Sequence, residues 1–190
     1  MNVISVDIDG VLNYYPYPWI KFLNKKTNNC FETRKEAKTI LGAEVYQLIK
    51  DEYRISKTKA SLPINKSLVE QLQQLYKNDF RFYISTSRPI KDSKYPELYN
   101  LTYSWLSKNK VPFDKLYFKE DSNLFFEKVK DVLFHIDDEL KYATLFSKKN
   151  IKTYLYNKDY QGIKNNTDSE LIIPIKDFSF LNKLKPSLYY

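Results

Sequence analysis

Short apolar segments alternate with amphipathic segments of helical period along most of the chain. The segments with strand character lie at residues 3–6, 80–85, 115–118, 132–136, 152–156 and 171–173. Strands separated by helices usually pair in parallel through right-handed crossovers, and the helices then cover both faces of the sheet. The expected fold class is therefore α/β, with a mostly parallel sheet flanked by helices.

The helices between these strands carry recognisable start signals. Thr33 and Glu36 have the spacing of a capping box, which predicts a helix that runs to about Asp51. Ser67 and Glu70 have the same spacing and predict the start of another helix. Further helices are expected from Pro96, over about 123–130, after Leu140 and, near the end of the chain, over about 176–185.

Polar residues follow three of the predicted strands at the point where each strand ends. They are Asp7 and Asp9 after the first strand, Thr86 and Arg88 after the second, and Asp137 and Asp138 after the fourth. In an open parallel sheet, ligands bind beyond the carboxyl ends of the strands. The convergence of these residues at one edge predicts a functional site there.

The residue types at this edge suit the chemistry of phosphate esters. A phosphate monoester is a dianion, so its cleavage requires charge neutralisation, in-line positioning and protonation of the leaving oxygen. Carboxylates that hold Mg²⁺ can meet these needs, which fits Asp7 together with Asp137 or Asp138. Asp7 would also attack the phosphorus, and Asp9 would protonate the leaving group and later activate water. We therefore expect a Mg²⁺-dependent phosphohydrolase with Asp7 as its nucleophile.

The segment from Val6 to Leu12, which contains both Asp7 and Asp9, resembles motif I of the haloacid dehalogenase superfamily. Thr86 matches the hydroxyl residue of motif II, and the acid pair after the fourth strand matches motif IV. The resemblance implies the superfamily's Rossmann-like parallel sheet, an aspartyl-phosphate intermediate and a Mg²⁺ cofactor. It also implies a phosphate-binding set of Thr86, Ser87 and Arg88, and a metal-binding set of Asp7, Asp9, Asp137 and Asp138.

Motif III of the superfamily is a lysine, and two candidates compete for this position. Lys119 directly follows a predicted strand and so belongs at the expected edge of the sheet. Lys128 lies nine residues before Asp137, late in the predicted helix, where it would point away from the site. We prefer Lys119. The position nearer the start of that helix holds Asn123, so a degenerate motif III stays open.

The segment between the first strand and the second capping box resembles the helical cap that this superfamily inserts after motif I. The expected domains are a catalytic core at 1–13 and 68–190 and a helical cap at 14–67. Cap residues and the Ser-Arg-Pro of motif II resemble the 5′(3′)-deoxyribonucleotidase-like branch and its uncharacterised bacterial relatives. Arg54, Lys57 and Lys59, with Arg88, could hold a second anionic group. The aromatic residues that could stack on a base are Tyr14, Tyr15, Tyr17 and Trp19.

Composition limits the cellular setting more than it limits the function. The single cysteine, Cys30, excludes an intramolecular disulfide, and no apolar run is long enough for a membrane span. The first residues have no signal-peptide pattern, so we expect a cytoplasmic protein. The net charge of +8 comes from scattered lysines, which favours a solvated basic surface over a nucleic-acid partner. His135 lies in a predicted buried strand and is expected to be a core residue.

The expected substrate is a small phosphorylated metabolite, with a nucleoside 5′-monophosphate or a deoxynucleotide as the leading candidate. A nucleic-acid end (3′-) phosphatase and a sugar-phosphate phosphatase share the same motifs and stay open as alternatives. A catalytically weak binding or regulatory protein that kept the fold is the non-enzyme alternative, because motif III is ambiguous. The oligomeric state has no signature in the sequence.

Overall fold

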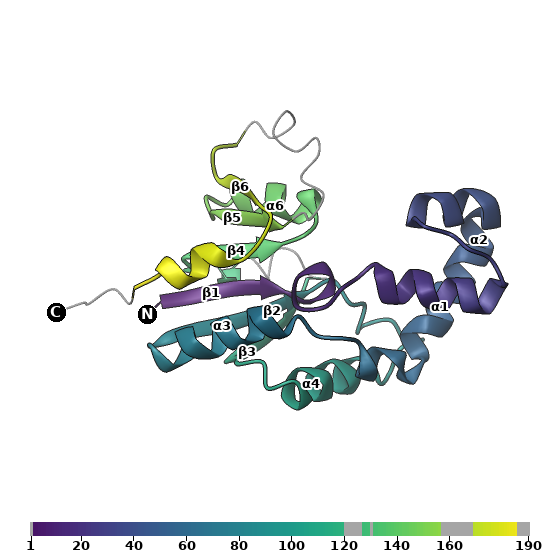
Figure 1. The fold of residues 1–190 in the computed structure, drawn as a ribbon, viewed down its shortest axis with the longest axis horizontal. Coiled ribbons are helices and arrows are strands. Elements are labelled where there is room, and N and C mark those ends of the chain that lie inside the picture. Colours follow the sequence, from purple (N-terminus) through teal and green to yellow (C-terminus); the bar gives the residue numbers. More distant parts are fainter. Residues whose placement is uncertain (1, 120–126, 130, 157–168, 186–190) are drawn as a thin grey trace.

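The computed structural model describes residues 2–119, 127–129, 131–156 and 169–185, and its centre is a six-stranded parallel sheet (Figure 1). The strand order is β3-β2-β1-β4-β5-β6, and every pair of neighbours is parallel. This arrangement confirms the α/β class. The strands are β1 (Asn2–Asp7), β2 (Phe80–Thr86), β3 (Lys115–Phe118), β4 (Phe134–Asp137), β5 (Thr153–Tyr156) and β6 (Ile172–Ile175).

The central strand β1 brings the predicted polar strand ends together. It pairs with β2 on one side, where Asp7 lies opposite Ser85, and with β4 on the other, where Val6 lies opposite Ile136. The chain order therefore reverses direction across β1, which is the place where parallel sheets bind ligands. The residues that follow β1, β2 and β4 consequently meet at one edge.

Side chains of β1 alternate between the two faces of the sheet, and each face has its own core. Ile4 belongs to the larger core, which α3 (Lys66–Lys77) and the 3₁₀ turn η3 (Ser179–Lys183) cover. Val3 belongs to a smaller core that contains Phe146 of α6 (Leu140–Ser147). Helix α4 (Leu98–Lys108) adds Trp105 and Leu106 to the larger core.

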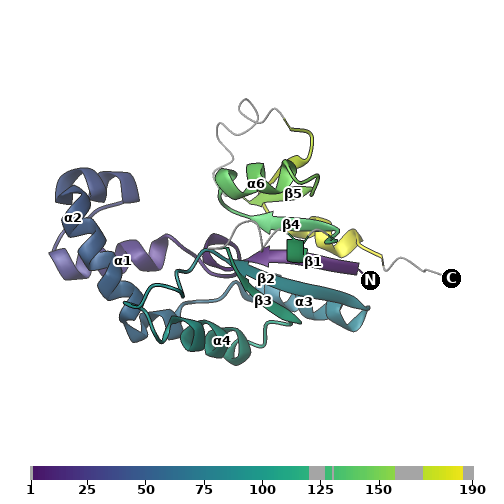
Figure 2. The ribbon, with the colours of Figure 1, turned by 180° about the vertical axis from the view of Figure 1, so that it is seen from behind.

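A helical segment lies beyond the carboxyl end of β1, apart from the layers that cover the sheet (Figures 1 and 2). It consists of α1 (Tyr17–Thr27) and α2 (Arg34–Ile55), and the 3₁₀ turn η2 (Lys57–Ser61) that follows packs back against α4. Its two connections to the sheet run together, because Asn13 forms an antiparallel bridge with Ile64 and the Asn65 amide donates to the Leu12 carbonyl at 2.8 Å. The division into a core and a cap at 14–67 stays a prediction.

Two helix starts differ from the sequence expectation. The second capping box is wrong, because Asn65 caps α3 by accepting a hydrogen bond from the Leu68 amide and Ser67 lies inside the first turn. Helix α4 begins at Leu98 rather than Pro96. The Thr33–Glu36 capping box is confirmed.

Other helix bounds also shift. Helix α2 continues past Asp51 to Ile55, and the expected terminal helix is the short η3. Most of the helix expected at 123–130 lies outside the described residues. Within the described part of the chain, no helix combines the length and the apolar character needed to cross a membrane.

Candidate functional site

A tight loop after β1 sets the geometry of the site. The chain turns back over Ile8–Leu12, where the Asn13 amide donates to the Ile8 carbonyl at 3.1 Å and Gly10 has a φ of 96°. A Cβ atom at Gly10 would overlap the carboxylate of Asp138. Only glycine therefore combines this backbone conformation with so close an approach of the main chain to Asp138.

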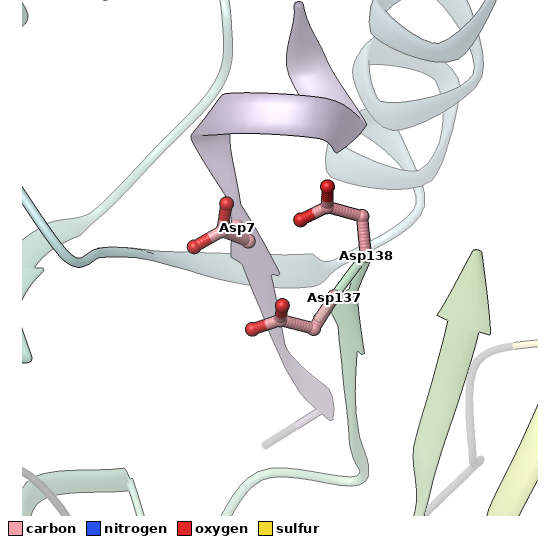
Figure 3. A group of neighbouring side chains, drawn as sticks. All are labelled: Asp7, Asp137 and Asp138. Carbon is pink, nitrogen blue, oxygen red and sulfur yellow. The ribbon is translucent and has the colours of Figure 1, made fainter. Parts of the chain in front are cut away.

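Three carboxylates gather beside this loop (Figure 3). Asp7 ends β1, Asp137 ends β4, and Asp138 follows directly; one oxygen from each lies within 4.8 Å of the others. Burial raises the pKa of Asp7 to about 8, helped by the neighbouring Asp137 charge and opposed by Lys119. Burial and the charges of Asp7 and Asp137 raise the pKa of Asp138 to about 9. Crowded oxygen ligands of this kind fit a hard divalent cation such as Mg²⁺.

Lys119 lies between two of these acids. Its buried Nζ atom is 2.6 Å from Asp7 Oδ1 and 2.6 Å from Asp137 Oδ2. Burial alone would lower the pKa of this amine, but Asp137 and Asp7 raise it above its usual value, so Lys119 stays charged. Burial alone would raise the pKa of Asp137, but Lys119 and His135 hold it below its usual range.

The structure separates the two motif III candidates. Lys119 follows β3, and its amide donates to the Thr86 carbonyl at 2.7 Å, which ties it to the end of β2. Lys128 is exposed, and its amine lies 5.8 Å from the centre of the Tyr117 ring. Lys119 is thus brought into the site and Lys128 is not. Asn123 lies outside the described residues.

Asp9 faces cations instead of the other carboxylates. Arg88 donates from Nε to Oδ2 at 3.1 Å and from Nη2 to Oδ1 at 3.0 Å, and Asn13 donates to Oδ1 at 2.7 Å. Lys59 Nζ is 3.5 Å from Oδ2. Burial opposes ionisation, yet Arg88 and Lys59 hold the pKa of Asp9 well below its usual range. Asp9 is therefore ionised. The expected metal-binding set had four acids, and the structure gathers three of them, Asp7, Asp137 and Asp138, with the Asp9 side chain outside this group.

The predicted phosphate-binding turn follows β2, but its arginine is already engaged. Arg88 is 3% exposed, and its Nη1 atom donates to the Thr102 hydroxyl at 3.0 Å. Thr86 is buried, and its hydroxyl accepts from the Arg88 amide at 3.4 Å. Ser87 is exposed and lines the cavity above the site. The structure thus gives Arg88 the direct role of orienting Asp9.

His135 is buried, as expected, but it also contacts the site. Its ring stacks on Phe146 with 3.7 Å between centroids, and Nδ1 is 3.0 Å from the Ser5 hydroxyl. Its Nε2 is 2.8 Å from Asp137 Oδ2. Burial lowers the pKa of His135 to about 4, so the ring is neutral at pH 7. Residues two apart on a strand share a face, and that spacing from Asp137 was the signal for this contact.

A cavity lies between the sheet edge and the helical segment. Arg54 and Lys59 line it, as predicted, together with Arg34 and Lys50, which the sequence prediction missed. Lys57 is exposed and is not part of the lining. Arg34 and Lys50 both lie on α2, the helix that lines the side of the cavity opposite the sheet edge.

The aromatic residues expected to stack on a base divide into two groups. Trp19 is fully buried and donates from its indole nitrogen to the Tyr46 hydroxyl at 2.9 Å, so it packs within the helical segment at the wall of the cavity above the site. Tyr14 and Tyr17 line a neighbouring cleft of about 800 Å³. This cleft shares Tyr15 with the cavity above the site.

The sheet order, the loop after β1 and the helical segment that follows it define a fold of the haloacid dehalogenase type. A predicted phosphatase from Clostridium acetobutylicum superposes with a TM-score of 0.67 at 18% identity, covering 96% of this chain and 97% of that chain. A haloacid dehalogenase-like hydrolase from Streptococcus pneumoniae gives 0.66 at 12%, covering 96% and 98%.

A third solved structure with this fold contains ligands. It is D,D-heptose 1,7-bisphosphate phosphatase from B. bronchiseptica, complexed with magnesium and phosphate, with a TM-score of 0.57 at 10% identity over 96% of this chain and 97% of that chain. At these identities the likeness establishes the fold. No protein-family model matches the chain, and no sequence among the curated proteins matches it.

Proposed function

We propose that this chain is a Mg²⁺-dependent phosphomonoester hydrolase of the haloacid dehalogenase superfamily, with Asp7 as the nucleophile. The observation that carries the proposal is the convergence of Asp7, Asp137 and Asp138 around one point, with Lys119 in contact with the first two. Structures with the same fold include a phosphatase complexed with magnesium and phosphate, which supports the choice of metal and reaction.

In this proposal the residues divide the work. Asp7 attacks the phosphorus and forms an aspartyl-phosphate, and Lys119 offsets the negative charge beside it. The Thr86 hydroxyl and the Ser87 hydroxyl and amide bind the phosphoryl oxygens. Bound Mg²⁺, held by Asp7, Asp137 and Asp138, would supply further charge neutralisation.

Asp9 would act in both halves of the reaction. Its ionised form suits the second step, in which it takes a proton from the water that hydrolyses the aspartyl-phosphate. The first step requires its protonated form, because the leaving oxygen must receive a proton. A bound phosphate dianion disfavours a second negative charge nearby, so substrate binding raises the pKa of Asp9 and promotes proton uptake.

Two classes of small substrate deserve direct comparison. A nucleoside 5′-monophosphate or deoxynucleotide is supported by the cleft that Tyr14 and Tyr17 line, where an aromatic ring can pack on a base. Sugar phosphates are supported by the cations of the cavity and by neighbours that act on D,D-heptose 1,7-bisphosphate. The helical segment that faces the site disfavours a nucleic-acid strand end as substrate.

The test is release of phosphate from p-nitrophenyl phosphate and from a panel of nucleotides and sugar phosphates, with and without Mg²⁺. Asp7→Asn is expected to reduce the rate by about 10⁴- to 10⁶-fold, as removal of other covalent nucleophiles does. Asp131→Asn, an exposed position, is the matched control and retains activity. Unchanged turnover in Asp7→Asn contradicts the mechanism. Metal binding without turnover of any compound would favour a binding protein that kept the fold.

A further inference from the structure

Arg88 pairs with Asp9, whereas the other four cations that line the cavity lie beside tyrosine rings. Arg34 and Arg54 also donate to the hydroxyl groups of Tyr15 and Tyr95, at 3.3 and 3.1 Å. Each charged group lies 5.0–6.0 Å from the centre of a ring, within the range of cation–π attraction. Such contacts orient a cation while leaving most of its charge available, unlike a close carboxylate partner. The pairs are Arg34 with Tyr15, Lys50 with Tyr46, Arg54 with Tyr95 and Lys59 with Tyr53.

Three of these cations have no carboxylate partner at hydrogen-bond distance among the residues that the structure describes. Arg34 approaches Glu139 only to 3.9 Å, and Arg54 approaches Asp51 to 3.7 Å. Lys50 has no carboxylate partner within the described part of the chain. Lys59 differs, because it contacts Asp9 beside the three-carboxylate group.

Lys50 is half-buried, so water only partly screens the repulsion between its charge and those of Arg34 and Arg54. Its amine is partly removed from water, and burial followed by the charges of Arg54 and Arg34 lowers its pKa, although Glu139 and Asp9 act in the opposite direction. Like charges held together in a partly dry cavity are costly unless an anion joins them. An anion bound between these three cations would relieve the repulsion between them.

A break in α2 brings these residues to one cavity. Arg34 and Lys50 would lie about 24 Å apart along a straight helix at 1.5 Å per residue. They line the same cavity because Gly42, between them, has a φ of 76° and a ψ of 161° and interrupts the helix. Lys50 and Arg54 are one turn apart and so share a face of the second half of α2.

We propose that Arg34, Lys50 and Arg54 form a subsite for a second phosphate group of the substrate, on the helical side of the cavity whose other side holds Asp7. The inference rests on the proposed function and specifies its substrate class: a small molecule with two phosphate groups. Two arginine guanidinium groups and one ammonium group supply enough donors for a phosphate dianion. The same chemistry accepts a sugar bisphosphate or a nucleoside bisphosphate.

The test compares matched pairs that differ only in the second phosphate. Binding to Asp7→Asn, measured by calorimetry with Mg²⁺, avoids turnover. The pairs are fructose 1,6-bisphosphate against fructose 6-phosphate, and adenosine 3′,5′-bisphosphate against adenosine 5′-monophosphate. We expect the second phosphate to tighten binding at least tenfold in one pair, which also identifies the leaving-group class. No gain in either pair overturns the proposal.

Variants then assign the gain to the residues. Lys50→Met and, separately, Arg54→Met are expected to remove most of the gain while changing binding of the monophosphate by less than about threefold. Lys38→Met is the matched control, since Lys38 is exposed on the same helix. A gain that survives both Lys50→Met and Arg54→Met overturns the assignment. Absence of phosphate release by the unmodified protein would refute the proposed function. The binding constants of the variants test the subsite independently of that result.

Discussion

Arg88 contacts both carboxylate oxygens of Asp9, at 3.1 Å and 3.0 Å, in the bidentate geometry that a guanidinium group favours. The two residues come from different strand ends, so this pair fixes the loop after β1 to the turn after β2. It also keeps ionised the carboxylate that is proposed to move protons. The pair therefore links the stability of the site to the protonation of Asp9.

Arg88→Met is expected to lower the free energy of unfolding by about 3 kcal/mol at pH 7, because it leaves a largely buried carboxylate without its main partner. The folded protein holds the pKa of Asp9 below its unfolded value of 3.8. The stabilisation is therefore present above pH 4 and is lost as the pH falls further. Urea unfolding of both proteins at pH 7 and pH 3 measures this. An equal difference at the two pH values would contradict the assignment.

Lys119→Met is expected to abolish phosphate release and to lower the melting temperature, since Asp7 and Asp137 lose their shared cation. Added Mg²⁺ should restore part of the melting temperature, because a divalent cation can replace the missing charge. Lys128→Met provides the comparison and is expected to match the unmodified protein in both measurements, since Lys128 is exposed. Loss of activity in Lys128→Met would instead support the other assignment of motif III.

Mg²⁺ binding is expected to release protons and to tighten as the pH rises from 6 to 9. In the metal-free protein the pKa of Asp7 is about 8 and that of Asp138 about 9, so both carboxyls are largely protonated at pH 7. A metal ligand must be deprotonated. Affinity should rise about tenfold per pH unit for each proton released. Calorimetry in buffers of different ionisation enthalpy counts the protons, and a pH-independent affinity would refute this picture.

The same two carboxyls predict how the metal-free protein responds to pH. The folded state holds protons that the unfolded chain, with a pKa of 3.8 for these groups, has already released. Their contribution to stability is therefore lost as the pH rises from about 4 to 9. Melting curves in a chelator at pH 5 and pH 8.5 test this, and the difference should shrink when Mg²⁺ is present.

Gly42→Ala is expected to weaken binding of a bisphosphate more than binding of a monophosphate. The φ and ψ of Gly42 belong to a region that is nearly restricted to glycine, so a Cβ adds about 1–3 kcal/mol of strain even though the surrounding space is open. Straightening α2 would relieve this strain and move Arg34 away from Lys50. Ala43→Gly, an exposed neighbour, is the control for helix propensity. Equal effects of Gly42→Ala on both ligands would contradict the expectation.

Local patterns predicted which side chains meet at the carboxyl edge of the sheet, because each of these residues lies at or just after the end of a strand. Asp7, Thr86 and Asp137 needed only the ends of three apolar runs and the rule that parallel strands end at a common edge. Lys119 followed from the same argument, whereas the late helical position of Lys128 argued against it. Strand ends are short-range features, so the sequence reveals them.

The wall of the cavity could not be predicted in the same way. Arg34 and Lys50 come together only through the break at Gly42, and Lys57 turns away from them although it is adjacent to Arg54 and Lys59 in a cationic stretch. A glycine inside a helical run was the available signal. The pairing of Arg88 with Asp9 likewise depends on a tertiary contact that neither motif contains.

The bridge between Asn13 and Ile64 places the exit and the return of the helical segment side by side. Any chain that begins and ends at adjacent points can be exchanged for another of different length without moving the strand before it or the helix after it. The carboxylates at the sheet edge and the cations on α2 are thus encoded in separate stretches of sequence, and Lys59 contacts Asp9 where the two stretches meet. The cations on α2 can therefore be replaced without any change in the strands that carry Asp7 and Asp137.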